Sequence, residues 1–169
     1  MKAEEARFLL NYLLPAVESE YKTTRRVLAA VPADRQEYRP HPVSRSAFEL
    51  AWHIASGDVV FLEGITRGQF TAGVPAMPSY INTVADILEW YDRSLPGLIG
   101  QLKALTDEQL ARPIPFFGTI NEPAVAYLSF MLSHTRHHRG QLTAYLRPMG
   151  GKVPDIYGGS ADEPFQPPA

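Results

Sequence analysis

Three of the chain's five histidines lie within the ten residues SHTRHHRGQL, at positions 134, 137 and 138. On an α-helix, His134 and His138 are one turn apart and share a face. Two neutral imidazoles arranged in this way can bind one metal ion. The H-x-x-x-H spacing alone is a weak signal, because hydrogen-bonded core histidines and histidines on a solvated face also show it.

The residues around these histidines indicate which way they point. At about 100° per residue, a largely apolar stripe lies within about 60° of His134, and His138 belongs to it. His137 lies near the edge of this stripe. Arg136 and Arg139 point to the opposite side, where we expect a solvated face or an interface. The other members of the stripe are Tyr127, Phe130, Met131, Gln141 and Tyr145.

A third ligand can come from His53 on an earlier helix. We place it roughly 10 Å from the start of that helix, and the other two roughly 14–20 Å from the end of theirs, so antiparallel packing brings them to similar heights. Gly57 and Gly64 share the inward face of His53 and are expected to leave space beside its ring. Three neutral histidines with an open position fit a mononuclear catalytic-type site. A di-iron bundle would need Glu-x-x-His pairs, which the sequence lacks.

Other polar residues near these positions have simpler interpretations. Gln141 could orient a ligand or a bound water, or could be a hydrogen-bonded core amide. We interpret the two tyrosines of the stripe as core residues with satisfied hydroxyls, although they could donate to a substrate. We interpret His137 as a packing residue or as support for a ligand. Glu49 is interpreted as a helix cap and His41 as a loop residue.

Four helical segments must position these residues. Apolar spacing and capping signals predict helices over 4–31, 46 to about 66, 83 to about 105, and 123 to about 147. Pro15 should kink the first helix or mark a false start. Residues 67–82 read as a long crossover, the sequence RPIPFFG reads as a loop, and no strand pattern is convincing. We therefore expect an all-α four-helix bundle over residues 1–148 and an extended tail over 149–169, packed on or near it.

Composition narrows the classes of function. The 169 residues include 16 basic and 18 acidic side chains, for a net charge of −2, which argues against a nucleic-acid binder. No apolar run approaches the roughly 20 residues of a membrane span, and the N-terminus MKAEEARFLL has no signal-peptide pattern, so we expect a cytoplasmic protein. The chain has no cysteine, which excludes disulfides, thiolate ligands and a cysteine nucleophile.

Three segments resemble the DinB/YfiT-like superfamily: FELAWHIASGD, MLSHTRHHRGQLTAYLRPMG and VPDIYGGSADE. The resemblance covers nearly the whole chain, and its most specific part is H-x-x-H-H-R-G-Q-L-x-x-Y-L-R. It implies an up-down-down-up four-helix bundle and a divalent metal bound by His53, His134 and His138. Zinc or nickel is the expected metal, with iron and manganese as alternatives. Gly159 stands where the family's tail has a proline.

The resemblance also implies the class of function. We expect a metal-dependent enzyme, a hydrolase or a thiol-dependent transferase, acting on a small molecule and in the second case using a low-molecular-weight thiol. The alternative is a non-catalytic metal-stabilised bundle that acts as a sensor or interaction module. We expect a homodimer, no nucleic-acid partner and no membrane partner. The tail, with Tyr157, Asp162, Glu163 and Phe165, is expected to help wall the metal site.

Overall fold

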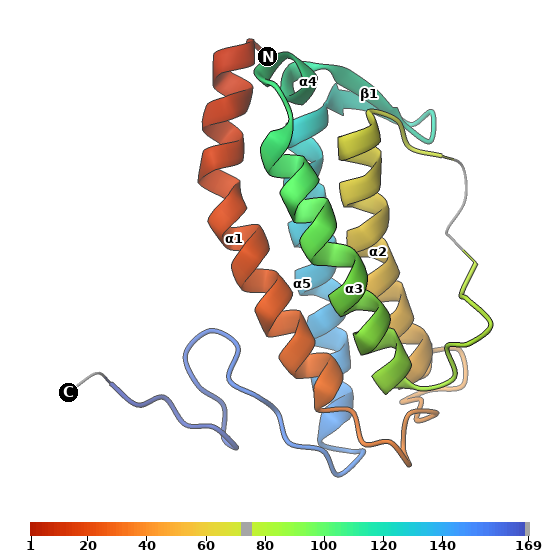
Figure 1. The fold of residues 1–169 in the computed structure, drawn as a ribbon. Helices are drawn as coiled ribbons and strands as arrows, with labels where there is room; N and C mark the ends of the chain where they lie inside the picture. Colours follow the sequence, from red (N-terminus) through yellow and green to blue (C-terminus); the bar gives the residue numbers. More distant parts are fainter. Residues whose placement is uncertain (72–75, 168–169) are drawn as a thin grey trace.

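The computed structural model describes residues 1–71 and 76–167. Four long helices form the molecule: α1 (Ala3–Ala29), α2 (Ala47–Arg67), α3 (Val84–Ala104) and α5 (Tyr127–Leu146). In Figure 1, α2 and α3 run upward while α1 and α5 run downward. This is the up-down-down-up four-helix bundle predicted from the sequence, and the fold class is confirmed.

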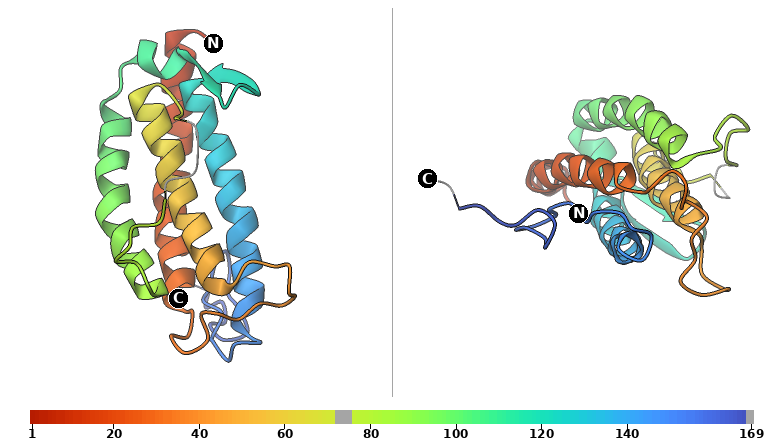
Figure 2. Two further views of the ribbon diagram at one scale, coloured as in Figure 1. Left: turned by 90° about the vertical axis from the view of Figure 1, so that its right-hand side faces the viewer. Right: turned by 90° about the horizontal axis from the view of Figure 1, so that it is seen from below.

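Helix α2 lies between α3 and α5, with which it makes the most extensive contacts of any helix pair in the bundle. Figure 2 shows this arrangement, in which α5 runs antiparallel to α2. The parallel pair α2 and α3 needs a connection that returns along the bundle, as expected for 67–82. Residues 72–75 of that connection lie outside the described residues.

Capping side chains fix where two of these helices begin. The Ser46 hydroxyl accepts from the Glu49 N–H at 3.2 Å, and the Glu49 carboxylate accepts from the Ser46 N–H at 2.8 Å. Thr83 and Asp86 form the same reciprocal pair at the start of α3. These capping boxes satisfy backbone donors that the first turn leaves unpaired. Both starts agree with the sequence prediction.

The alternative that Pro15 marks a false start is wrong. Helix α1 continues through it to Ala29. Pro15 lies on the exposed side of the helix, where water can satisfy the carbonyl that its missing N–H would have bonded.

The prediction that RPIPFFG, residues 112–118, is a plain loop is also wrong. After the short helix α4 (Asp107–Ala111), strands β1 (Pro113–Phe116) and β2 (Ile120–Pro123) pair antiparallel, and the 3-10 helix η1 (Ala124–Ala126) leads into α5. The turn places both Phe117 and Gly118 at positive φ, 48° and 73°, as in the primed turns that join tight hairpins. Pro113, Pro115 and Pro123 are residues that sequence patterns treat as unfavourable in strands. A two-stranded ribbon tolerates them because each strand has one edge that needs no hydrogen-bond donor.

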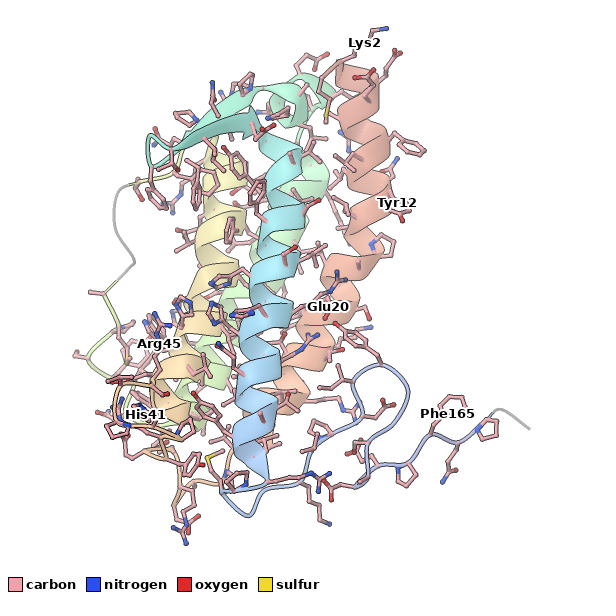
Figure 3. The ribbon with its side chains drawn as sticks, turned by 180° about the vertical axis from the view of Figure 1, so that it is seen from behind. Lys2, Tyr12, Glu20, His41, Arg45 and Phe165 are labelled. Carbon is pink, nitrogen blue, oxygen red and sulfur yellow. The ribbon has the colours of Figure 1, made fainter. Side chains whose placement is uncertain are left out.

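The tail folds back onto α1 and the outer side of α5. The Tyr157 hydroxyl donates to Glu20 at 2.6 Å, Arg26 pairs with Glu163, and Arg147 pairs with Asp162 at 3.0 Å. Figure 3 shows Glu20 and the tail on one side of α5, and Arg45 on the other. These polar contacts lie away from the histidines, so the structure gives no support to a tail that walls the metal site.

The expectation of a solvated Arg139 is wrong. Its side chain is 2% exposed, and its Nη2 lies 2.5 Å from a carboxylate oxygen of the buried Glu20. Arg136, by contrast, is half exposed and donates to Glu20 at 2.8 Å. The face opposite the histidines is therefore a buried ionic contact between α5, α1 and the tail.

Within 1–71 and 76–167, no helix is both long and apolar enough to cross a bilayer.

Candidate metal centre

Helices α2 and α5 bring three histidines together. His53 lies two turns into α2, and His134 and His138 lie one turn apart on the facing side of α5. The Nε2 atom of His53 is 3.0 Å from Nε2 of His138 and 3.1 Å from Nε2 of His134. All three rings are half-buried. We call these residues the histidine triad.

The spacing of the triad fits a single metal ion. Nitrogens bound to one ion at about 2.0–2.1 Å lie about 3 Å apart, which is the separation of His53 Nε2 from each of the other two Nε2 atoms. Two neutral imidazole nitrogens about 3 Å apart form a hydrogen bond only if one of them carries a proton. His53 Nε2 faces the Nε2 atoms of both His134 and His138. This nitrogen can hold one proton at most. One shared cation satisfies all three lone pairs at once.

The protonation pattern points the lone pairs inward. His138 Nδ1 lies 2.8 Å from the Gln141 Oε1, an acceptor, so this nitrogen carries the proton and Nε2 of His138 is left bare. Gln141 is exposed, so the core-amide interpretation is excluded and its contact is with the ligand ring. His134 Nδ1 is buried and has no hydrogen-bond partner among the described residues.

Burial keeps the triad neutral. It lowers the pKa of His53 to about 4, with smaller contributions from the charges of Arg45, His138 and His134. It also lowers the pKa of His134 to about 4. The pKa of His138 is lowered by burial and partly restored by Gln141. Neutral imidazole is the form that binds metals, so the triad is ready for an ion at neutral pH.

Gly57 makes room for a ligand ring. A Cβ at this position would lie 2.6 Å from Cε1 and 3.1 Å from Nδ1 of His134. A Cβ at Gly64 would lie 2.2 Å from the ring of Phe70. The expectation that both glycines leave open space beside His53 is therefore wrong, because the rings of His134 and Phe70 fill that space.

The remaining predicted residues divide between the core, the caps and the surface. Tyr127 is fully buried and donates to the Ile114 carbonyl at 2.6 Å, as expected for a core tyrosine. Glu49 caps α2 as predicted. His137 is exposed beside His138 and outside the triad, and His41 is exposed in the loop before α2.

The triad lies between an aromatic layer and a polar opening. On one side the Phe61 ring is 6.0 Å from His134 and stacks on Phe116 of the hairpin at 5.6 Å. On the other side lies Arg45, the residue before the Ser46 cap, whose charge contributes to lowering the pKa of all three histidines. Arg45 carries no signal in the sequence beyond its place one residue before a predicted cap, so its position near the triad could not be predicted.

Fold and site together define a class: a four-helix bundle with three half-buried histidines from two adjacent antiparallel helices, spaced for one metal ion. The chain belongs to the DinB family, whose model matches residues 7–167. The family resemblance seen in the sequence is confirmed.

Similar proteins and structures agree with this membership. The uncharacterized protein YrdA of Bacillus subtilis is 27% identical over 156 residues, covering 91% of this chain and 91% of that protein. The crystal structure of the DinB-like protein YjoA from Bacillus subtilis has a TM-score of 0.72 at 25% identity, covering 86% of this chain and 97% of that one. A mycothiol-dependent maleylpyruvate isomerase has a TM-score of 0.58 at 12% identity, covering 86% of this chain and 64% of that one, which shows a shared fold alone.

Proposed function

We propose that His53, His134 and His138 bind one divalent metal ion through Nε2, and that the chain is a metal-dependent enzyme acting on a small molecule. The observation that carries this proposal is the approach of His53 Nε2 to the Nε2 atoms of His138 and His134, at 3.0 and 3.1 Å, with all three ligand atoms within 4.8 Å of one another on half-buried rings. The ligand set has no negative charge of its own. A dication bound there keeps its full charge for a substrate or water.

The reaction class we propose is hydrolysis or thiol-dependent group transfer. A divalent ion held by three histidines supplies a Lewis acid, a water of lowered pKa or a binding position for a thiolate. The chain itself has no cysteine, so a thiol must come from a second molecule. A mycothiol-dependent maleylpyruvate isomerase shares this fold at 12% identity, and this likeness is one reason to include thiol-dependent transfer in the proposal.

The chain's own residues hold and orient the site. Gln141 accepts from His138 Nδ1 and fixes that ring with Nε2 inward. Gly57 gives the His134 ring its place. The Tyr127 hydroxyl is already bonded to backbone groups, so it is not available as an acid or base.

Zinc or nickel is the metal we propose, with iron and manganese as alternatives. Imidazole nitrogen is a common ligand of zinc, nickel and iron, whereas manganese prefers oxygen ligands. The proposed partners are a small-molecule substrate and, for the transfer reaction, a low-molecular-weight thiol. We propose no nucleic-acid or membrane partner, because the net charge is −2. We also propose a homodimer, supported by exposed aromatic residues on α1.

The test is whether a bound metal has an exchangeable position. Protein purified without a histidine tag is loaded with cobalt and titrated with azide while its visible spectrum is recorded. The proposal predicts a saturable spectral change and turnover in a screen of ester, amide and thiol-transfer substrates. A cobalt spectrum that responds to no added ligand would instead favour a non-catalytic, metal-stabilised bundle.

A further inference from the structure

Arg45 is an exposed arginine near the triad, and it forms no ion pair with any residue of 1–71 or 76–167. Among the described residues, the ion pairs at the start of α2 engage Arg39 and leave Arg45 out. Glu49, one turn further along α2, is the carboxylate whose pKa Arg45 influences. Both of its oxygens are already held by Arg39, at 2.8 and 3.0 Å, and one also accepts from the Ser46 N–H. The exposed Arg45 guanidinium can therefore exchange water for a ligand without breaking an ion pair.

A cleft of about 500 Å³ opens beside Arg45. It is lined by residues of the loop before α2, of α2 and of α5: Val43, Ser44, Arg45, Leu50, Gln141 and Tyr145. We call it the Arg45 cleft. Gln141 joins it to the triad, because the same side chain lines the cleft and bonds His138. Figure 3 shows Arg45 near the start of α2, where its side chain lies on the open side of the bundle.

The position of the cleft relative to the triad is set by helix geometry. Leu50 precedes His53 by three residues and Gln141 follows His138 by three, so both lie about one turn, roughly 5 Å, toward the same end of the bundle. A volume of about 500 Å³ is in the range of small-molecule sites. A ligand bound at the triad can therefore extend into the cleft.

The charge of the cleft selects the group that binds there. Its one ionised lining residue is Arg45, and the neighbouring Arg39–Glu49 pair is neutral overall. A guanidinium presents two parallel N–H donors that match a carboxylate. A phosphate dianion would call for a second cation, which the lining residues do not supply.

We propose that the small-molecule substrate or co-substrate of this site carries a carboxylate, and that Arg45 binds it in the Arg45 cleft while another part of the molecule reaches the triad. This inference rests on the proposed metal-dependent function and names the ligand class of that site. Arg45 is a specificity-determining residue in this scheme.

The experiment uses the cobalt-loaded chain of 169 residues and matched probes. Mercaptopropionate and mercaptohexanoate are titrated beside their neutral carboxamide twins, with the thiolate-to-cobalt absorption band as the readout. The wild type should bind at least one acid roughly tenfold more tightly than its amide, the effect of one charge-assisted hydrogen-bonded contact. Arg45→Gln should remove that preference and Arg45→Lys should keep part of it.

Arg112→Gln is the control, because it removes the same charge from an exposed arginine beside Gly68, at the far end of α2. It should keep the wild-type preference. Equal acid and amide affinities in the wild type, or an unchanged preference in Arg45→Gln, would overturn the inference while leaving the metal proposal standing. Tighter binding of a mercaptoalkyl phosphate than of the acids would overturn the carboxylate assignment.

A second measurement tests the Arg45 cleft independently of the metal. If neither azide nor any thiol changes the cobalt spectrum, the open metal position is refuted. The cleft is then tested by nitrogen-15 NMR of the arginine Nε–H signals during titration with propionate. A saturable shift of the Arg45 signal, absent in Arg45→Gln, would support the cleft as a carboxylate site. An Arg45 signal that does not move would refute it.

Discussion

The space beside Gly57 decides where the His134 ring lies. In Gly57→Ala the added Cβ would meet that ring at 2.6 Å, so the ring must turn and move Nε2 away from the other two. We expect metal affinity to fall roughly tenfold or more, as when a residue that supports a ligand is changed. Competition with a chromophoric chelator measures this affinity.

Gly140→Ala is the matched control, because a Cβ at Gly140 on α5 meets no atom within 4 Å. It should bind metal as the wild type does. Unchanged affinity in Gly57→Ala would show that the His134 ring is not held where the structure places it.

The triad was predictable residue by residue, since each ring lies on the inward stripe that helical periodicity indicated. What surrounds the triad was not. The burial of Arg139 depends on Glu20, more than a hundred positions earlier, and no local pattern in the sequence reports that pairing. The role of Gln141 was open until the distance to His138 resolved it.

At the scale of the elements, a bound ion would tie α2 to α5. An ion that binds the native state stabilises it by about 2.7 kcal/mol at a hundred times its Kd. Chelation should therefore lower the melting temperature of this chain by about 5–10 °C. Differential scanning calorimetry with and without chelator, after the loss of metal is verified, gives the answer. A melting temperature that stays constant would contradict a metal link between these helices.

The buried Glu20 ties α1 to α5 and the tail. Burial alone would raise its pKa, but hydrogen bonds from Tyr157, Arg136 and Arg139 outweigh that effect and lower the pKa below its ordinary value of 4.5. A carboxylate with a lowered pKa stabilises the fold above pH 4.5, and this stabilisation is lost as the pH falls further. Wild-type stability should therefore drop steeply in acid.

Glu20→Gln should cost about 3–5 kcal/mol at neutral pH, because it leaves Arg139 buried without its counter-charge. It should also flatten the acid branch of the stability profile, measured by urea denaturation between neutral and acid pH. Glu18→Gln is the control, since Glu18 forms an exposed pair with Lys103 and should change stability little. Equal costs for the two variants would refute the role of Glu20.

Sequence signals between residues a few positions apart predicted the helices. Contacts between residues far apart in the sequence could not be predicted in this way. Capping pairs marked the starts of α2 and α3 because a cap involves residues three apart. The β1–β2 hairpin was missed because prolines at 113, 115 and 123 are unfavourable in strands, and only their pairing in space makes the ribbon.

At the scale of the whole molecule, we expect the proposed homodimer to form through an exposed apolar pair on α1. Phe8 is 73% and Tyr12 72% exposed, one turn apart, and Figure 3 shows Tyr12 directed away from the bundle. We expect light scattering at micromolar concentration to give twice the chain mass. The double variant Phe8→Ser with Tyr12→Ser should be monomeric, while Phe165→Ser in the tail should not change the mass. A wild type that is monomeric throughout would rule out a stable dimer.

Metal content of the tag-free protein tests the central claim most directly. Elemental analysis after growth with zinc and nickel, and after dialysis, should give about one ion per chain in the wild type and in His137→Ala, whose ring lies outside the triad. His53→Ala, His134→Ala and His138→Ala should each lose most of it. A wild type that takes up no divalent metal, or a His134→Ala variant that keeps one ion per chain, would contradict the account.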